Sequence, residues 1–439
     1  MMFRRCNFIL LLLVSLLLSG CALRTVDQMY CLPKRSQEYS DLQTAIDGAM
    51  VGLEYSAPLS GENRQTVQMA DLDGDREEEY LLFARGSSEK PMKILIFDLD
   101  QGSYYLRETI ESRGSAFELI EYADMDGRPG LEIVVGRQVS DQVPRTLSVY
   151  TFTEGEAEQL MSVSYSKCIT FDPDQDDRTD LMVITPGESE ADNAVACLYS
   201  YQDGTMVRSA EANLSEPADH IKRIRASALQ DGTPAVYVAS SVEEQAIITD
   251  VFALKEGKFT NVSFSNESGT SVQTLRNYYV YADDIDDDGI LELPSLITMR
   301  TRNRGEAPHY LIRWYAMTLD GAEVDKMYTF HNFDGGWYVR LDGIWASRVM
   351  VTQEGNTYNF FLWDEEFQNN ENIMTVFALT GSNRDAAAVE DNRFVLYRTD
   401  GVLYAAKLET AAASCGISQD SLTESFHLIR QDWKTGETE

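Results

Sequence analysis

Two hydrophobic periodicities alternate along this chain and predict different secondary structures. Apolar side chains recur three and four positions apart at Leu42, Ala45, Ile46, Ala49, Met50 and Leu53. That spacing gives one apolar stripe on an α-helix, which we expect to pack against the domain that follows. Ser40 and Gln43 have capping-box spacing at the start of this helix. From residue 66 the period changes to short apolar runs such as Tyr80–Ala84, which are typical of strands.

Strands and acidic loops recur in a fixed order through residues 65–330. Loops begin at residues 71, 124, 172, 227 and 284, at intervals of 53, 48, 55 and 57 residues, and the copy at 227 has lost most of its acids. Four short strands per repeat at such a period indicate the blades of a β-propeller. We therefore predict a mainly β fold with a propeller of about five blades. Six or seven blades stay open, because the C-terminal strands can close a larger ring.

Residues 284–292, with the sequence DIDDDGILE, form the most complete acidic loop. Carboxylates occupy its first, third, fifth and ninth positions, and Ca²⁺ prefers six to eight oxygen ligands in such a spacing. A glycine at the sixth position allows the positive φ that folds the loop back on its ion. Converging carboxylates repel one another unless a cation neutralises them. The loops therefore predict three structural Ca²⁺ sites, with the ligands Asp71, Asp73, Asp75, Glu79, Asp172, Asp174, Asp176, Asp180, Asp284, Asp286, Asp288 and Glu292.

The remaining loops depart from this pattern in specific ways. The second copy keeps Asp124, Asp126 and Glu132, but Arg128 stands at the fifth position, where its guanidinium can itself neutralise the carboxylates. The first and third copies have Arg76 and Asp177 in place of the sixth-position glycine. These departures weaken the metal prediction for the second loop most.

These strand–loop–strand units resemble the FG-GAP/VCBS repeats of integrin-α-like β-propellers, whose blades carry DxDxDG calcium loops. The resemblance covers roughly residues 65–330 and implies that Ca²⁺ holds the blades together on one face. It leaves the opposite face for recognition of a ligand. Under this resemblance the metal is structural.

The C-terminal part of the chain differs in composition from the repeats. All five tryptophans follow residue 313, and no DxDxDG-like loop occurs after residue 292. A run of strands ends in a helical pattern with Leu422, Phe426 and Ile429 on one face. We therefore expect residues 331–439 to form a separate α+β domain.

The N-terminus has the features of a bacterial export signal. Arg4 and Arg5 precede an apolar stretch at residues 8–18, which is shorter than a membrane-spanning helix requires. Leu18-Ser-Gly-Cys21 resembles the lipobox of lipoproteins from Gram-positive bacteria, which implies cleavage after residue 20 and lipidation of Cys21. We expect a signal peptide at 1–20, a tether and helix at 21–64, and anchoring on the extracytoplasmic face of the cell membrane.

Charge and cysteine content narrow the possible partners. The formal net charge of -34 argues against nucleic acid, because binding nucleic acid requires a basic surface. Neither the cysteines nor the histidines have zinc-ligand spacing. Cys168 and Cys197 can form a disulfide across one repeat or remain buried thiols, and the sequence leaves both open.

No catalytic motif stands out in the sequence. It has no G-x-S-x-G, H-E-x-x-H, P-loop or G-x-G-x-x-G pattern. We expect a non-enzymatic binding or scaffold protein for a protein, peptide or glycan. The alternative is an exported enzyme that acts on cell-wall or extracellular polysaccharide, with paired acids on the top face of the propeller. Asp364, Glu365 and Glu366 are acids of this kind, but an adjacent run on a loop tip is more typical of a solvated surface. Trp337, Tyr338, Trp345 and Trp363 are candidates for a sugar platform or for core packing.

Overall fold

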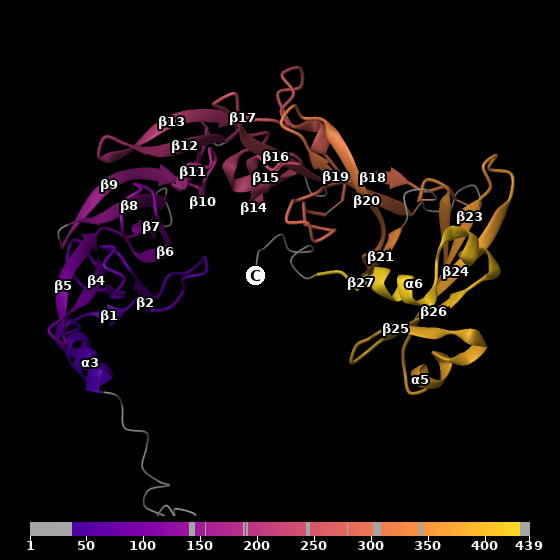
Figure 1. Ribbon diagram of the computed structural model, residues 1–439, viewed down its shortest axis with the longest axis horizontal. Coiled ribbons are helices and arrows are strands. Elements are labelled where there is room, and N and C mark those ends of the chain that lie inside the picture. Colours follow the sequence, from indigo (N-terminus) through magenta and orange to yellow (C-terminus); the bar gives the residue numbers. More distant parts are fainter. Residues whose placement is uncertain are drawn as a thin grey trace, which may run out of the picture.

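The computed structural model describes residues 37–139, 145–153, 155–187, 189, 192–242, 246–278, 280–301, 309–341 and 346–430. Within these residues the protein is mainly β, as predicted. Six antiparallel sheets follow one another in chain order around an open arc (Figure 1). The predicted signal peptide (1–20), the lipidation site Cys21, Trp345 and Trp433 lie outside the described residues. No helix in the described ranges is long and apolar enough to span a membrane.

The first three sheets come from residues 54–213, and the short helix α3 (Gln37–Ala49) precedes them. In the first sheet, β1 and β2 both pair with β3. The strands are β1 (Glu54–Tyr55), β2 (Val67–Ala70), β3 (Glu79–Arg85), β4 (Met92–Asp100) and β5 (Ser103–Ser112); then β6 (Ala116–Ala123), β7 (Glu132–Gln138), β8 (Arg145–Thr153) and β9 (Glu156–Tyr165); then β10 (Lys167–Phe171), β11 (Asp180–Thr185), β12 (Val195–Gln202) and β13 (Thr205–Asn213).

The last three sheets come from residues 221–428. The fifth sheet has the order β18-β19-β20-β21-β27, and the sixth has the order β22-β23-β24-β26-β25. The strands are β14 (Ile221–Ala228), β15 (Pro234–Val242), β16 (Ala246–Lys255) and β17 (Lys258–Asn261); β18 (Leu293–Thr298), β19 (Tyr310–Met317), β20 (Glu323–Asn332), β21 (Trp337–Leu341) and β27 (Phe426–Leu428); and β22 (Val349–Glu354), β23 (Thr357–Trp363), β24 (Asn370–Leu379), β25 (Phe394–Arg398) and β26 (Leu403–Leu408).

Continuous apolar runs in the inner strands are buried on both faces of their sheets. In β3, Leu81 and Phe83 pack against Phe117 of the second sheet. Their neighbours Leu82 and Ala84 point to the other face, because successive strand residues alternate. The same alternation recurs in β7 and β11, and it explains why these strands read as unbroken apolar runs.

Five hydrophobic cores lie between consecutive sheets in the described residues. One core joins the first and second sheets, the next joins the second and third, and the series continues to the fifth and sixth. Among the described residues, no core joins the first sheet to the sixth. The arrangement is therefore a linear stack bent into an arc.

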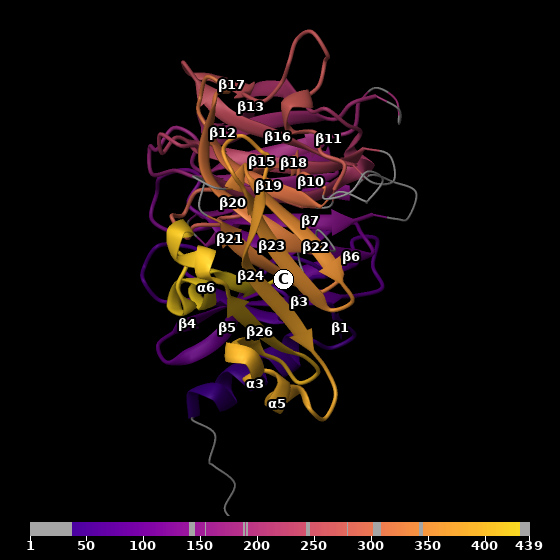
Figure 2. The ribbon, with the colours of Figure 1, turned by 90° about the vertical axis from the view of Figure 1, so that its right-hand side faces the viewer.

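Helical segments cover the outer faces at the two ends of this stack. Leu42 and Ile46 of α3 pack on Leu82 and Phe97 of the first sheet, on the stripe that the sequence predicts. At the other end, Ala388, which follows α5 (Arg384–Ala387), packs on Leu403 and Ala405 of the sixth sheet. Figure 2 shows α5 and α6 beside that sheet. Each end of the stack is thus covered by its own helical segment, and among the described residues the first and sixth sheets do not pack on each other.

The C-terminal region differs from the prediction at two places. The expected boundary between residues 330 and 331 falls inside β20, and β21 pairs with β20 in the fifth sheet. The strands that follow, β22 to β26, form the sixth sheet. The expected final helix is shorter: α6 spans Gln419–Ser425, its capping box joins Ser418 and Ser421, and Phe426 begins β27. Strand β27 forms because the edge of β21 offers unpaired backbone groups, which Val339 and its neighbours use to pair with Phe426.

The structure also describes the predicted capping box at Ser40 and the two cysteines of the third repeat. Helix α3 begins at Gln37, so Ser40 lies inside it and its carbonyl accepts the Thr44 hydroxyl at 2.8 Å. Cys168 and Cys197 are free thiols, because both pair with Val183 of β11 from opposite sides, and that strand separates them.

The covering role of α3 can be tested by truncating Ile46, which is 6% exposed. Replacing Ile46 with Ala removes buried methyl groups between α3 and β3, and we expect the free energy of unfolding to fall by about 2–5 kcal/mol. Urea denaturation measures this change. Val51→Ala is the matched control, since Val51 is 82% exposed. A loss at Ile46 no larger than that at Val51 would contradict the packing described.

Candidate metal centres

Four acidic loops connect successive strands at the same end of their sheets. The first joins β2 to β3, the second β6 to β7 and the third β10 to β11. The fourth acidic loop, residues 284–292, precedes β18, and an isolated bridge between Asp283 and Glu292 closes its base. In every loop the last acid is therefore fixed by strand pairing.

The first aspartate organises each loop by accepting backbone N–H groups. Asp71 accepts from Gly74 at 2.7 Å and from Arg76 at 3.0 Å. Asp284 accepts from Asp288 and Gly289, each at 2.9 Å. Asp172 and Asp124 make equivalent bonds. These hydrogen bonds give the backbone N–H groups of the turn a partner and hold the carboxylate over the loop.

In the loops that begin at residues 71, 172 and 284, the backbone at the fourth and sixth positions is left-handed with or without glycine. Gly289 has φ 87°, and Arg76 and Asp177 reach φ 75° and 67° at the same position of their loops. A non-glycine residue in this region costs about 1–2 kcal/mol. The missing glycines noted in the sequence therefore do not change the loop shape, which the aspartate bonds maintain.

The glutamate at the ninth position lies buried under the loop. Glu79 and Glu292 are 1% and 0% exposed. Glu79 Oε2 accepts the Leu72 N–H at 2.7 Å, Glu292 Oε2 accepts that of Ile285 at 3.1 Å, and Glu132 Oε2 accepts that of Met125 at 2.7 Å. Burial, reinforced by nearby aspartates, raises the pKa of Glu79 and of Glu292 to about 7.

The structure brings together most but not all of the predicted ligands. In each group, one oxygen from each of three acids lies within 4.8 Å of the others. The groups are Asp71, Asp73 and Glu79; Asp124, Asp126 and Glu132; Asp172, Asp174 and Asp176; and Asp284, Asp286 and Glu292. Such groups can hold a metal ion. The second group was doubtful from sequence because of Arg128, whose Nε lies 3.6 Å from Asp126.

Three predicted ligands lie outside these groups. Asp75 and Asp288 accept backbone N–H groups two residues ahead, at 2.8 and 2.9 Å, and serve the turn. Asp180 is shorter than the glutamates at its position, and its Oδ2 accepts the Ser200 hydroxyl at 2.9 Å. Burial raises the pKa of Asp180 to about 6.

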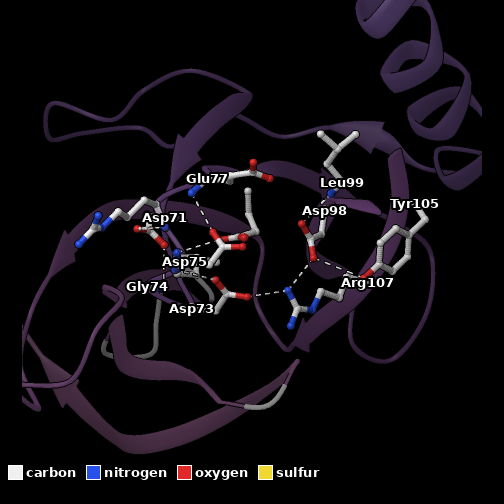
Figure 3. A network of polar contacts seen from close by, with 12 residues as sticks. Asp71, Asp73, Gly74, Asp75, Glu77, Asp98, Leu99, Tyr105 and Arg107 are labelled. Atoms are coloured by element: carbon white, nitrogen blue, oxygen red, sulfur yellow. Dashed lines mark hydrogen bonds and ion pairs between the residues drawn. The ribbon is translucent and has the colours of Figure 1, made fainter. Parts of the chain in front are cut away.

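Each acidic loop also has a basic side chain beside it. Arg107 of β5 donates to Asp73 at 2.8 Å and to Asp98 at 2.6 Å (Figure 3). Lys326 of β20 pairs with Asp288 at 2.6 Å, and Arg178 donates from Nε to Asp176 at 2.8 Å. Each base offsets part of the negative charge. The bases on β5 and β20 lie 34 and 38 residues from the acids they contact, so loop spacing could not reveal them.

The loops contact one another in series along the arc. Asp71 O accepts the Leu131 N–H at 3.0 Å, and Asp124 O accepts the Thr179 N–H at 2.7 Å. A side chain at Gly130 would lie 2.4 Å from the Leu72 carbonyl, so the second loop needs glycine to approach the first. The turn at Ser227 keeps this link without acids, since its hydroxyl accepts the Leu291 N–H at 3.1 Å.

Several carboxylate oxygens in these groups are buried without a hydrogen-bond partner. They include Glu292 Oε1 and Asp286 Oδ1 in the loop at 284–292. A buried carboxylate oxygen left without a donor loses its hydration and gains nothing in return. A bound cation would remove this cost, so the donor set fits a hard metal ion.

Trp337, Tyr338 and Asp364, which were candidates for sugar binding or catalysis, contribute to the core or to a turn. Trp337 and Tyr338 are buried, at 0% and 7% exposure, and belong to the core of the fifth sheet. Asp364 accepts the Gln368 and Asn369 N–H groups and so closes the turn after β23. Glu365 and Glu366 on that turn are exposed.

Comparison with known proteins gives little to add to this geometry. No protein-family model matches the chain, and no curated protein matches it. Among solved structures, the exotype rhamnogalacturonan lyase YesX is 13% identical, with 75% of this chain and 70% of that chain covered and a TM-score of 0.28. Rhamnogalacturonan lyase PL11 of Bacillus licheniformis is 11% identical, with 73% and 72% covered and a TM-score of 0.30. At such TM-scores the likeness carries no argument about function.

The burial of Glu292 predicts a pH dependence of stability in the presence of a chelator. Folding raises the pKa of Glu292 from 4.5 to about 7, so the metal-free native state retains a proton that the unfolded chain releases. The contribution of Glu292 to stability is therefore complete below about pH 4.5 and is lost as the pH rises toward 7. In Glu292→Gln we expect urea unfolding in EDTA to show a smaller fall over this range.

Glu365→Gln provides the control, because Glu365 is exposed on a turn. It should leave the pH dependence of the parent protein intact. An unchanged slope in Glu292→Gln would show that this carboxyl does not titrate as its burial requires.

Proposed function

We propose that this protein is a lipid-anchored binding or scaffold protein of the extracytoplasmic membrane face, with a propeller-like body held together by structural Ca²⁺. The observation that carries the metal part is the repeated group of three carboxylates with a buried ninth-position glutamate. The anchor rests on the lipobox-like sequence that ends at Cys21. In this proposal the six sheets that the described residues form correspond to blades arranged as an arc.

Calcium fits these sites better than a smaller cation. All the candidate ligands are carboxylate oxygens, which suit the hard cation Ca²⁺ and its flexible coordination. Mg²⁺ demands a stricter octahedral geometry, and zinc favours nitrogen and sulfur. Because backbone hydrogen bonds join the first acidic loop to the second and the second to the third, an ion that orders one of these loops also supports its neighbour.

The loops leave the other end of the sheets available for recognition. The first three loops lead into β3, β7 and β11, and the fourth leads into β18. The connection that follows each of these strands therefore lies at the opposite end of its sheet. In the fifth sheet, residues 284–292 lie at the start of β18, whereas the connections from β18 to β19 and from β20 to β21 lie at its far end. We place ligand binding at that far end and the metal ions at the near end.

Calcium dependence can be tested by thermal unfolding with Ca²⁺ and with EDTA. Extracellular modules bind Ca²⁺ with dissociation constants of roughly 10⁻⁴–10⁻³ M. At ten times that constant, each site stabilises the protein by about 1.4 kcal/mol, which raises Tm by about 1.5 °C per site in a chain of 439 residues. Asp286→Ala removes a ligand from the loop at 284–292 and should abolish that loop's share of the Ca²⁺-induced rise in Tm.

Asp231→Ala is the matched control for this variant. Asp231 lies in the degenerate fourth repeat, where it accepts the Thr233 N–H at 3.1 Å and belongs to no acid group found in the structure. This variant should retain the full Ca²⁺ response. Superimposable melting curves of the parent protein in Ca²⁺ and EDTA would rule out the metal part of the proposal.

Membrane anchoring is tested by fractionation of cells that express the Cys21→Ser variant. A serine cannot accept the thioether-linked lipid, so we expect the protein to leave the membrane fraction. Cys415→Ser controls for loss of a cysteine, since Cys415 is a free thiol in the sixth-sheet region. Equal membrane retention of Cys21→Ser and the parent protein would refute the anchor.

A further inference from the structure

A cavity of about 290 Å³ lies between the fifth and sixth sheets, at the end away from the acidic loops. Its fifth-sheet wall comes from the start of β19 and from the end of β20 with the turn that follows it. Gln353 and Tyr358, on either side of the β22–β23 turn, supply the sixth-sheet wall. The volume is near the lower end for ligand pockets and suits one small ring better than an extended chain.

Aromatic side chains form much of this cavity. Tyr278 and Phe333 meet edge to face, with ring centroids 4.3 Å apart. Phe330 and Tyr358 are buried in the floor, whereas Tyr310 is 40% exposed at the mouth. The exposed ring of Tyr310 can therefore meet a ligand that enters from solvent.

The polar groups of the cavity offer hydrogen-bond donors and acceptors. Asn332 Oδ1 accepts the Gly335 N–H at 3.0 Å, which orients the amide. Its Nδ2 is buried and has no hydrogen-bond partner among the described residues, so it needs an acceptor. The carboxylate of Asp334 is exposed at the rim and provides acceptor oxygens.

The charge of the cavity excludes some classes of ligand. None of the described lining residues is lysine or arginine, and Asp334 is acidic. Phosphates, sulfates and uronic acids therefore find no lysine or arginine among these residues and meet the negative charge of Asp334. His331 also lines the cavity, but burial lowers the pKa of its imidazole to about 3. An organic cation would suit the aromatic rings and Asp334, but it would leave the Asn332 amide donor without an acceptor.

From these contacts we infer that the cavity binds a single neutral sugar residue, with one face of the ring on Tyr310 and a hydroxyl oxygen accepting from Asn332. This inference rests on the proposed binding function and specifies its ligand as a neutral glycan. Aromatic rings stack on the apolar faces of sugars, while amides and carboxylates bond the hydroxyl groups.

The test is titration of the detergent-solubilised full chain with glucose, galactose, rhamnose and N-acetylglucosamine, measured by saturation-transfer NMR and calorimetry. Glucuronate and tetramethylammonium serve as the anionic and cationic probes. We expect at least one neutral sugar to bind, and Tyr310→Ala to raise its Kd by about tenfold or more, a change that corresponds to a loss of about 1.4 kcal/mol of binding free energy. Tyr310→Phe keeps the ring and should retain binding.

Tyr397→Ala is the matched control, because Tyr397 is an exposed strand tyrosine, 45% accessible, away from the cavity. It should leave the Kd unchanged. The inference is overturned if no neutral sugar binds, if only glucuronate or tetramethylammonium binds, or if Tyr310→Ala binds as tightly as the parent. Calcium-dependent melting and membrane fractionation do not involve this cavity, so they test the proposed function separately from its sugar ligand.

Discussion

The inner strands of this protein are apolar on both faces, and both faces of a sheet need a cover. Successive sheets meet this need for each other, since the alternate residues of strands such as β3 and β7 face different neighbours. Among the described residues, only the first and sixth sheets have an outer face that no neighbouring sheet covers. There α3 and the segment around Ala388 cover the first and sixth sheets. Burial of apolar area at about 25 cal/mol per Å² drives this stacking, and the covered ends allow an arc to exist without a closed ring.

Apolar contacts determine which faces of the sheets pack together. The loops at the ends of the strands are held by other interactions. At one end, acidic loops contact one another through backbone hydrogen bonds, and their carboxylates converge within each loop. This convergence opposes folding unless charge is compensated, because like charges in a partly buried site raise each other's free energy. Arg107 and Lys326 supply part of that compensation. The buried, unpartnered oxygen of Glu292 indicates where the remaining compensation is needed.

Local patterns in the sequence predicted the parts of this structure that depend on local interactions. The helix stripe at Leu42 and Ile46, the strand runs and the acidic loops all follow from neighbours within ten residues. The strands of the sixth sheet were predicted, but they were assigned to a separate domain because they carry no acidic loop. The boundary between residues 330 and 331 was placed too early, because β20 continues through residue 332. Phe426 reads as part of a helix by spacing, but pairing with β21 makes it a strand residue. The ion pairs of Arg107 and Lys326 depend on strand register across the sheet, which no local pattern contains.

Counting the Ca²⁺ ions bound per chain tests the central claim most directly. Equilibrium dialysis of the purified protein against ⁴⁵Ca²⁺ at saturating concentration gives this number without reference to stability. The account predicts saturable Ca²⁺ binding at the four acid groups that the described residues form, and hence three to four ions per chain. The second group should bind most weakly, because Arg128 lies beside Asp126. Absence of saturable Ca²⁺ binding would contradict it.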